Sequence, residues 1–147
     1  MFNITPLDKK HYTQWLPLWE ENCRHQVTQD ITSTTWQRMC DAHSAVNGLG
    51  AFDGDELVGF VHYILHPVTG HMNPVAYMQD VFTAPAHRRR GVARQLIGEL
   101  AAIGRAQGWP RIYWLAEADN EAAQQLYADI GVKLKFTLHA LPTAPLD

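Results

Sequence analysis

The stretch from residue 75 to residue 116 constrains the fold of this chain more than any other. Val75 to Thr83 alternates like a strand, Gly91 to Gln107 carries an amphipathic helical pattern, and Ile112 to Ala116 reads as a buried strand. The sequence Gly108-Trp109-Pro110 ends the helix in the expected manner. Because one helix joins the two strands, they are expected to lie parallel in one sheet, with the helix packed on its face. This predicts a β-α-β unit.

The segments before this unit predict an antiparallel half of the sheet. Residues 45–52 and 56–66 are alternating apolar runs on either side of Asp53-Gly54-Asp55. Asp-Gly between two such runs is a strong hairpin signal. Residues 2–7 read as a short first strand, and two helices are expected between this strand and the hairpin.

The first of these helices opens near Asp8, and the second spans about Thr34 to His43. In the first helix, apolar residues recur at steps of three and four and mark one face: Tyr12, Trp15, Leu16, Trp19 and Cys23. The second helix is expected to carry Trp36, Met39 and Cys40 inward, with Ser33 or Thr34 as its N-cap.

A helix over Asn120 to Ile130, closed by Gly131, and an alternating strand over Val132 to Leu138 complete the pattern. The element order is then β-α-α-β-β-β-α-β-α-β, which places the chain in the α/β class with a mixed sheet. With 147 residues, of which 46% are hydrophobic and 18% charged, the chain is expected to fold as a single domain over residues 1–147.

Charge, termini and cysteines narrow the function classes. A net charge of -3 argues against a protein that wraps nucleic acid. Residues 1–10 lack the apolar core of a signal peptide, and no run approaches the 18 or so apolar residues of a membrane span. Cys23 and Cys40 lie 17 residues apart without a CxxC partner. We therefore expect a cytoplasmic protein with reduced thiols.

The eight histidines do not predict a metal site. His62 and His66 share one face of the strand expected over residues 56–66, but residues four apart on a strand are separated by about 13 Å. That distance is too long for two ligands of one ion, and no metal is expected.

The chemistry of the sequence is concentrated where the strand ending at Thr83 turns into the next helix. Backbone N–H groups at a helix start lack partners within the helix, and the helix dipole adds partial positive charge, so such a junction binds anions such as pyrophosphate. Gly91 and Ala93 let a phosphate approach the main chain. Four arginines add charge-assisted hydrogen bonds: Arg88, Arg89, Arg90 and Arg94. A solvated basic helix start or a nucleic-acid patch would give the same pattern.

Two motifs resemble the GCN5-related N-acetyltransferase family. The sequence Arg88-Arg89-Arg90-Gly91-Val92-Ala93 is similar to its pyrophosphate signature, Arg/Gln-x-x-Gly-x-Gly/Ala, and follows a strand as it does in the family. Residues 120–127 resemble its Asn-x-x-Ala-x-x-Leu-Tyr helix, one helix and one strand downstream. The resemblance covers roughly residues 75–135, with Val132 where the family often has Phe.

The resemblance implies an acyl-CoA N-acyltransferase fold and the transfer of an acetyl group from acetyl-CoA to a primary amine of a small molecule or protein. Backbone groups of Val81, Phe82 and Thr83 would pair with the pantetheine arm like an added strand. The main chain from Arg88 to Arg94, through Gly91, Val92 and Ala93, would hold the pyrophosphate. Asn120 would hydrogen-bond the cofactor arm, cap its own helix, or do both. Tyr127 would protonate the leaving thiolate, although taken alone it reads as a core tyrosine.

Acetyl transfer also needs a base and a donor to the thioester carbonyl, which the resemblance places at a main-chain N–H near Val81. Asp80 is the first candidate for the base and Glu117 the second; either could instead be a surface carboxylate or the partner of an arginine. His62 and Tyr63 could line the acceptor pocket. The first two helices offer it aromatic and acidic side chains that suit a cationic amine: Tyr12, Trp15, Trp19, Glu20, Glu21 and Trp36. Of these, Trp15 and Trp19 are read first as core residues.

Two other functions are compatible with the sequence. One is a non-catalytic acyl-CoA-binding module that keeps the fold and loses the chemistry. The other is a nucleic-acid-binding protein that uses the basic patch from Arg88 to Arg90. Homodimers are common in the family, but nothing in the sequence establishes one.

Overall fold

The computed structural model describes residues 1–144, and by its internal contacts the chain divides into two compact units. The first unit is Met1–Leu115, and the second begins at Ala116. No helix within residues 1–144 is both long enough and apolar enough to cross a membrane. The organisation of the whole chain as one domain stays a prediction.

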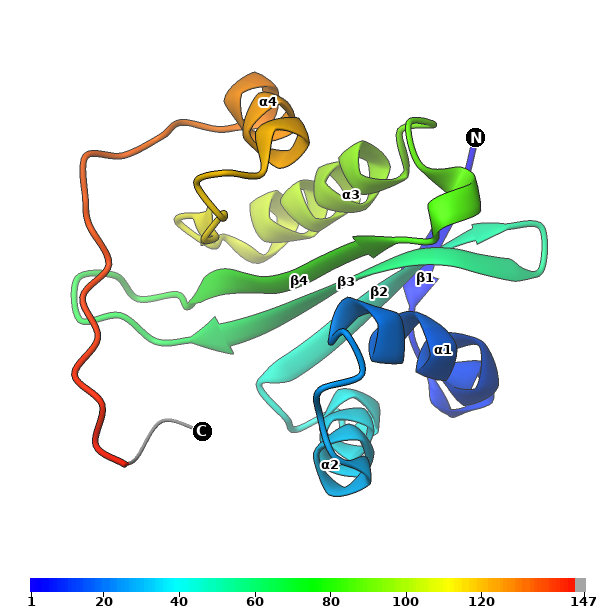
Figure 1. Ribbon diagram of the computed structural model, residues 1–147. Coiled ribbons are helices and arrows are strands. Elements are labelled where there is room, and N and C mark those ends of the chain that lie inside the picture. The colour runs from blue at the N-terminus through cyan, green and yellow to red at the C-terminus, as the bar shows by residue number, and fades with distance from the viewer. Residues whose placement is uncertain (145–147) are drawn as a thin grey trace. The chain divides into compact units, whose positions relative to one another are not determined.

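A five-stranded sheet forms the centre of the first unit (Figure 1). Its strands follow in the order β1 (Asn3–Pro6), β2 (Val46–Asp53), β3 (Glu56–His66), β4 (Val75–Thr83) and β5 (Ile112–Tyr113). The first four strands are antiparallel neighbours, and β5 runs parallel to β4. The predicted hairpin, antiparallel half and β-α-β unit are therefore confirmed.

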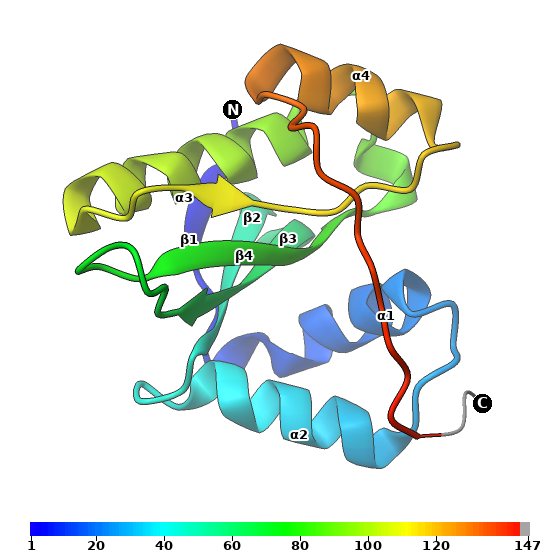
Figure 2. The ribbon, with the colours of Figure 1, turned by 90° about the vertical axis from the view of Figure 1, so that its left-hand side faces the viewer.

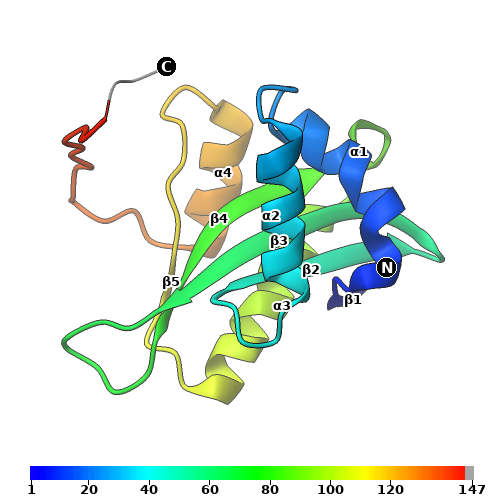
Figure 3. The same ribbon diagram turned by 90° about the horizontal axis from the view of Figure 1, so that it is seen from below.

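Helices cover both faces of this sheet. The helices α1 (Tyr12–Asn22) and α2 (Gln29–Cys40) lie on one face, and α3 (Val92–Gln107) lies on the other (Figure 2). Viewed from the side of α1 and α2, α2 crosses in front of the strands (Figure 3). Two short 3-10 helices, Lys9–His11 and Pro85–His87, precede α1 and α3. In its described part, residues 116–144, the second unit contains one helix, α4 (Glu121–Ile130).

The hydrophobic core of the first unit has a layer on each face of the sheet. Between the sheet and α1, Trp15 stacks on Trp19 with ring centroids 5.4 Å apart, and both side chains are buried. On the opposite face, α3 buries the apolar side of its predicted amphipathic pattern, including Leu96 and Leu100. The interpretation of Trp15 and Trp19 as core residues is therefore confirmed.

The predicted start of α2 was wrong. The helix begins at Gln29, five residues before Thr34, and its N-cap is Thr28, whose hydroxyl accepts from the Ile31 amide at 3.2 Å. The β-branched residues in its first turns have low helix propensity, but packing overrides it. Thr32 is buried, and its hydroxyl accepts a hydrogen bond from the Trp19 indole N–H at 3.0 Å.

The predicted last strand, Val132 to Leu138, was also wrong. Within residues 1–144 this segment pairs with no strand, although apolar and polar residues do alternate along it. Its apolar side chains are all exposed: Val132 by 83%, Leu134 by 60%, Phe136 by 84% and Leu138 by 74%. Alternation alone does not make a strand, because the backbone must find a neighbouring edge. The strand predicted over Ile112 to Ala116 is likewise reduced to two residues, since only Ile112 and Tyr113 pair with β4.

Candidate active site

A β-bulge in β4 shapes the site. On β3, His62 pairs with Asp80 and Tyr63 pairs with Met78, so Gln79 is an extra residue on β4. Neighbouring residues on a regular strand point to opposite faces of the sheet. At a bulge the side chains are re-aimed. Accordingly, Gln79 and Asp80 both line the same cavity.

This cavity, named here the Asp80 cavity, lies within the first unit and has a volume of about 250 Å³. It lies between α1 and α2 and strands β2, β3 and β4. Its lining residues are Trp19, Thr35, Arg38, Val46, His62, Ile64, Gln79 and Asp80. Ligand pockets for drug-sized molecules usually measure about 300 to 1,000 Å³, so this cavity fits a small ligand.

A chain of hydrogen bonds holds the Asp80 carboxylate. Its Oδ2 lies 3.0 Å from Nδ1 of His62, and its Oδ1 accepts from the side-chain amide of Asn22 at 3.3 Å. On the other side of the imidazole, the indole N–H of Trp15 donates to His62 Nε2 at 3.1 Å. Since an indole N–H can only donate, Nε2 is the unprotonated nitrogen and Nδ1–H donates to Asp80. The side chain of Asp80 keeps 21% exposure, while that of His62 is buried.

The structure brings some of the predicted acceptor-site residues to the Asp80 cavity and leaves others elsewhere. Asp80, His62 and Trp19 line it, whereas Tyr63 is buried against Trp109, with ring centroids 5.7 Å apart. None of the remaining predicted residues lines it: Tyr12, Trp15, Glu20, Glu21 and Trp36. The sequence reasoning missed Asn22, Arg38, Thr35 and Gln79, because neither the partner of Asp80 nor the bulge leaves a pattern in the sequence.

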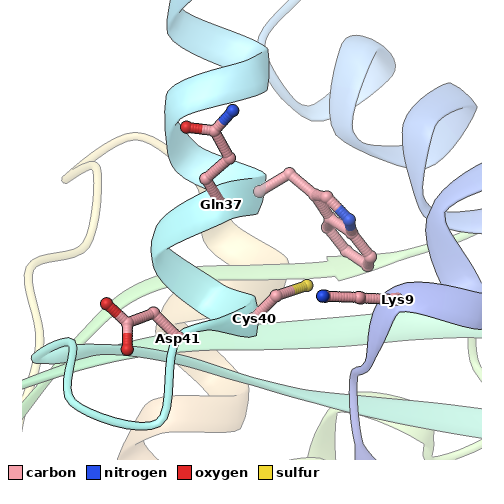
Figure 4. Close-up of a pocket in the computed structure, with 5 residues that line it drawn as sticks. Lys9, Gln37, Cys40 and Asp41 are labelled. Carbon is pink, nitrogen blue, oxygen red and sulfur yellow. The ribbon is translucent and has the colours of Figure 1, made fainter.

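Trp36 lines a second, more open cavity of about 500 Å³ (Figure 4). The other side chains around it are Lys9, Gln37, Cys40 and Asp41. Burial raises the pKa of the Cys40 thiol above its usual value, so this cysteine is not an activated nucleophile.

The edge of β4 that faces β5 is open along most of its length. Only Ala76 and Tyr77 pair with β5, and within residues 1–144 no strand continues this pairing toward Thr83. Val81, Phe82 and Thr83 pair with β3 on the other side. The backbone groups of this segment that point away from β3 pair with no strand within residues 1–144, and the Thr83 carbonyl accepts from Nε of Arg88.

The predicted anion site lies at the start of α3. Gly91 is the N-cap and supplies no side-chain cap, and the first helical hydrogen bond runs from the Gln95 amide to the Gly91 carbonyl at 3.0 Å. The amides of Val92 and Ala93 therefore have no partner within the helix. Gly91 has φ +81°, a conformation that favours glycine, and an added Cβ there would meet no atom within 4 Å. The position that a Cβ of residue 91 would occupy is therefore open space.

Two of the loop arginines are partly engaged by the chain itself. Arg88 donates from Nε to the Thr83 carbonyl at 3.1 Å, and its guanidinium lies 5.6 Å from the centre of the Phe82 ring. Arg90 Nη2 lies 3.8 Å from Asp53 Oδ2. Arg89 is exposed and, like Gly91, has a positive φ, +63°. The loop thus combines backbone N–H groups that lack partners within the helix with arginine side chains whose positions are fixed by contacts to the chain. This combination fits a diphosphate.

The second unit carries the remaining predicted residues. Asn120 is the N-cap of α4, and its side-chain oxygen accepts from the Ala123 amide at 3.1 Å, which confirms its capping role. Burial raises the pKa of the Tyr127 phenol above its ordinary value. Glu117 is exposed in the loop before α4, because β5 already ends at Tyr113, and its carbonyl accepts from the Asn120 amide. Within residues 1–144, no group of three or more His, Cys, Asp or Glu side chains is arranged to hold a metal ion.

Comparison with solved structures identifies the same fold in other proteins. A ribosomal-protein-alanine N-acetyltransferase from Brucella melitensis superposes with a TM-score of 0.81 and 22% identity, covering 97% of this chain and 99% of that one. The aminoglycoside N-acetyltransferase AAC(6')-Iy in complex with CoA superposes with a TM-score of 0.84 and 19% identity, covering 98% and 96% of the two chains.

Sequence comparison places the chain in a family. The D-amino-acid N-acetyltransferase HPA3 of Saccharomyces cerevisiae is 30% identical over 141 residues, which cover 92% of this chain and 88% of that protein. The model of the acetyltransferase (GNAT) family matches residues 9–132. This range includes the Asp80 cavity, the open edge of β4, α4 and the segment from Arg88 to Gly91 before α3, named here the α3 loop. The chain therefore belongs to the GNAT family of acetyltransferases and is an N-acetyltransferase.

Proposed function

We propose that this enzyme transfers an acetyl group from acetyl-CoA to the primary amine of a small molecule bound in the Asp80 cavity. The observation that carries the proposal is the placement of Asp80. Its carboxylate is held by His62 and Asn22, lines a cavity of small-molecule size, and belongs to the strand whose edge is open beyond Tyr77. An amine held there would lie beside that edge.

The chain offers three contacts for acetyl-CoA, two in the first unit and Asn120 in the second. The first is the start of α3, where the amides of Val92 and Ala93 and the arginines from Arg88 to Arg94 would hold the diphosphate. The second is the open edge of β4 from Val81 to Thr83, which would pair with the pantetheine arm. Asn120 uses one oxygen lone pair for its cap, and its amide N–H groups would serve as donors to the same arm.

In the proposed reaction, Asp80 attracts the acceptor ammonium and takes one of its protons, directly or through one water. A lysine-like ammonium has a pKa of about 10.4, so it needs such help near neutral pH. The nitrogen forms a bond to the acetyl carbon and loses a second proton to solvent, the carbon–sulfur bond breaks, and Tyr127 protonates the thiolate. Burial raises the pKa of Tyr127, which keeps this phenol protonated and able to donate. Glu117 is the alternative base.

The substrates printed in the names of similar proteins are amines: D-amino acids for the yeast relative and aminoglycosides for one structural neighbour. These names support an amine acceptor for this chain as well. The volume of the Asp80 cavity favours an acceptor of amino acid size over one of aminoglycoside size.

A screen of amines tests the proposal. Acetyl-CoA is incubated with the enzyme and a panel of amino acids, polyamines, aminoglycosides and peptides, and each mixture is read for free thiol and by mass spectrometry for an added acetyl group. We expect turnover with at least one small amine. Binding of coenzyme A without turnover on any amine would overturn the proposal in favour of a binding module. Stabilisation against heat by oligonucleotides, but not by coenzyme A, would favour the nucleic-acid alternative.

We also propose that the enzyme forms a homodimer and works in the cytoplasm. The exposed alternating side chains Val132, Leu134, Phe136 and Leu138 support the first point, because such a segment is suited to pairing with a second copy. Two free cysteines support the second, since reduced thiols persist in a reducing compartment. Light scattering on the wild type and on the double variant Leu134→Ser, Phe136→Ser tests the dimer; a wild-type monomer would refute it.

A further inference from the structure

The Asp80 cavity presents two full charges of opposite sign. Asp80 extends from β4, and Arg38 extends from the last turn of α2. The other lining side chains are uncharged, since the indole of Trp15 keeps Nε2 of His62 unprotonated. A ligand in this cavity therefore meets one anionic and one cationic group, with largely apolar walls between them.

The guanidinium of Arg38 is not used by the protein. The two oxygens of Asp80 each accept one hydrogen bond, from His62 and Asn22, and keep further lone pairs for a ligand. Arg38 is exposed, and within residues 1–144 it makes no ion pair and no side-chain hydrogen bond. A cation left without a partner beside a small cavity is available to an anionic group of a ligand. Arginine suits a carboxylate in particular, because its planar fork can donate two parallel hydrogen bonds.

We propose that the acceptor is a small amino acid, held with its ammonium group at Asp80 and its carboxylate at Arg38. The inference rests on the proposed function, because the same cavity must hold the reacting amine. It also assigns Arg38 as the residue that selects amino acids over plain amines. A polyamine or an aminoglycoside would bring a further cation toward Arg38, and like charges in one site oppose binding.

The experiment compares amino acids with the amines that remain after loss of the carboxylate: alanine with ethylamine, and leucine with isopentylamine. The measured quantity is the ratio of kcat/KM for the amino acid to kcat/KM for its matched amine. Comparing this ratio between wild type and variants cancels the different basicities of the amines. The variants are Arg38→Gln, Arg38→Glu and, as a charge-loss control on the exposed side of α3, Arg105→Gln.

We expect the wild-type enzyme to prefer the amino acid in each pair, in one or both enantiomers. Arg38→Gln should lower the ratio by about 10- to 100-fold, the usual range for one charge-assisted hydrogen-bonded pair. Arg38→Glu should shift the preference toward ethylenediamine, which presents a cation where the amino acid has its carboxylate. Arg105→Gln should leave the ratio as in the wild type. Melting curves and coenzyme A affinity verify that each variant is folded.

The outcomes separate this inference from the proposed function. If ethylamine, isopentylamine or a polyamine is acetylated as well as the amino acids, and the ratio is the same in folded Arg38→Gln, the acetyltransfer proposal stands and the amino acid inference is wrong. If an Arg38 variant does not fold, a wild-type preference for plain amines is sufficient to overturn the inference. If no amine at all is acetylated, the proposed function itself fails.

Discussion

Trp15 donates its indole N–H to Nε2 of His62 over 3.1 Å, and this hydrogen bond decides which ring nitrogen of the histidine carries the proton. His62 is thereby held as a neutral donor to Asp80 and cannot take a proton at Nε2 without losing Trp15. The histidine therefore positions the carboxylate, and proton acceptance is left to Asp80 itself. A fully buried tryptophan in the core thus sets the chemistry of the cavity.

Replacing Trp15 by Phe should remove the hydrogen bond that fixes the tautomer of His62. The variant leaves Nε2 of His62 buried without a donor, at a cost of about 1–3 kcal/mol in the free energy of unfolding, before the loss of ring contacts is added. Nitrogen NMR of the imidazole should report the Nδ1–H tautomer in the wild type and a mixture in the variant. Trp36→Phe is the matched control, because Trp36 lies in the same core cluster and its indole makes no hydrogen bond within residues 1–144. An unchanged tautomer in Trp15→Phe would contradict this role.

Replacing Asp80 by Asn should abolish most of the turnover. Loss of a general base lowers kcat by about 100-fold or more, while the affinity for coenzyme A should stay close to that of the wild type. Steady-state kinetics and calorimetry measure the two quantities. Asp55→Asn, at an exposed turn position, controls for the loss of one negative charge. If Glu117→Gln is inactive and Asp80→Asn is not, Glu117 is the base.

Replacing Gly91 by Ala should weaken coenzyme A binding beyond the effect on stability. Gly91 and Gly54 both have positive φ, +81° and +61°, and a Cβ at either position would meet no atom within 4 Å. Each Ala variant should therefore lose a similar stability of about 1–2 kcal/mol from backbone strain. Calorimetry with coenzyme A should show weaker binding only for Gly91→Ala. Equal coenzyme A affinities for Gly91→Ala and Gly54→Ala would show that the α3 loop is not part of the binding site.

Replacing Tyr127 by Phe should lower kcat by about 100-fold and leave coenzyme A affinity nearly intact, because only the proton donor is lost. Tyr12→Phe serves as the control, since Tyr12 lines neither cavity. A variant with full turnover would exclude Tyr127 as the acid.

Tyr127 should also affect the alkaline limit of stability. Burial raises the pKa of Tyr127 in the folded state above its ordinary value of 10.0, so the folded state holds this proton more tightly than the unfolded state. The contribution is complete below about pH 10 and is lost as the pH rises through the raised pKa. Denaturation curves from pH 8 upward should therefore fall less steeply above pH 10 for Tyr127→Phe than for the wild type. Equal slopes would contradict the raised pKa.

The sequence predicted what local pattern controls. The Asp53–Asp55 hairpin, β4 and the helix bounded by Gly91 and Gly108 follow from alternation, helical period and glycine at positions of positive φ. It also singled out Asp80 and the α3 loop as site residues, because the loop motif and the strand before it are contiguous in the chain; their roles stay predictions. The start of α2 could not be predicted, since the burial of Thr32 under Trp19 outweighs weak local propensity.

By itself, then, the sequence determined the order of the elements from β1 to α4, the β-α-β unit and the glycine-capped start of α3, all of which depend on interactions between residues close in the chain. Only the tertiary structure decided that Trp15, His62 and Asp80 form one hydrogen-bonded chain and that Arg38 shares a cavity with Asp80. It also decided that residues 132–138 pair with no strand within residues 1–144. Such contacts join distant segments whose positions are set by packing and strand pairing, and neither leaves a local pattern that can be read in advance.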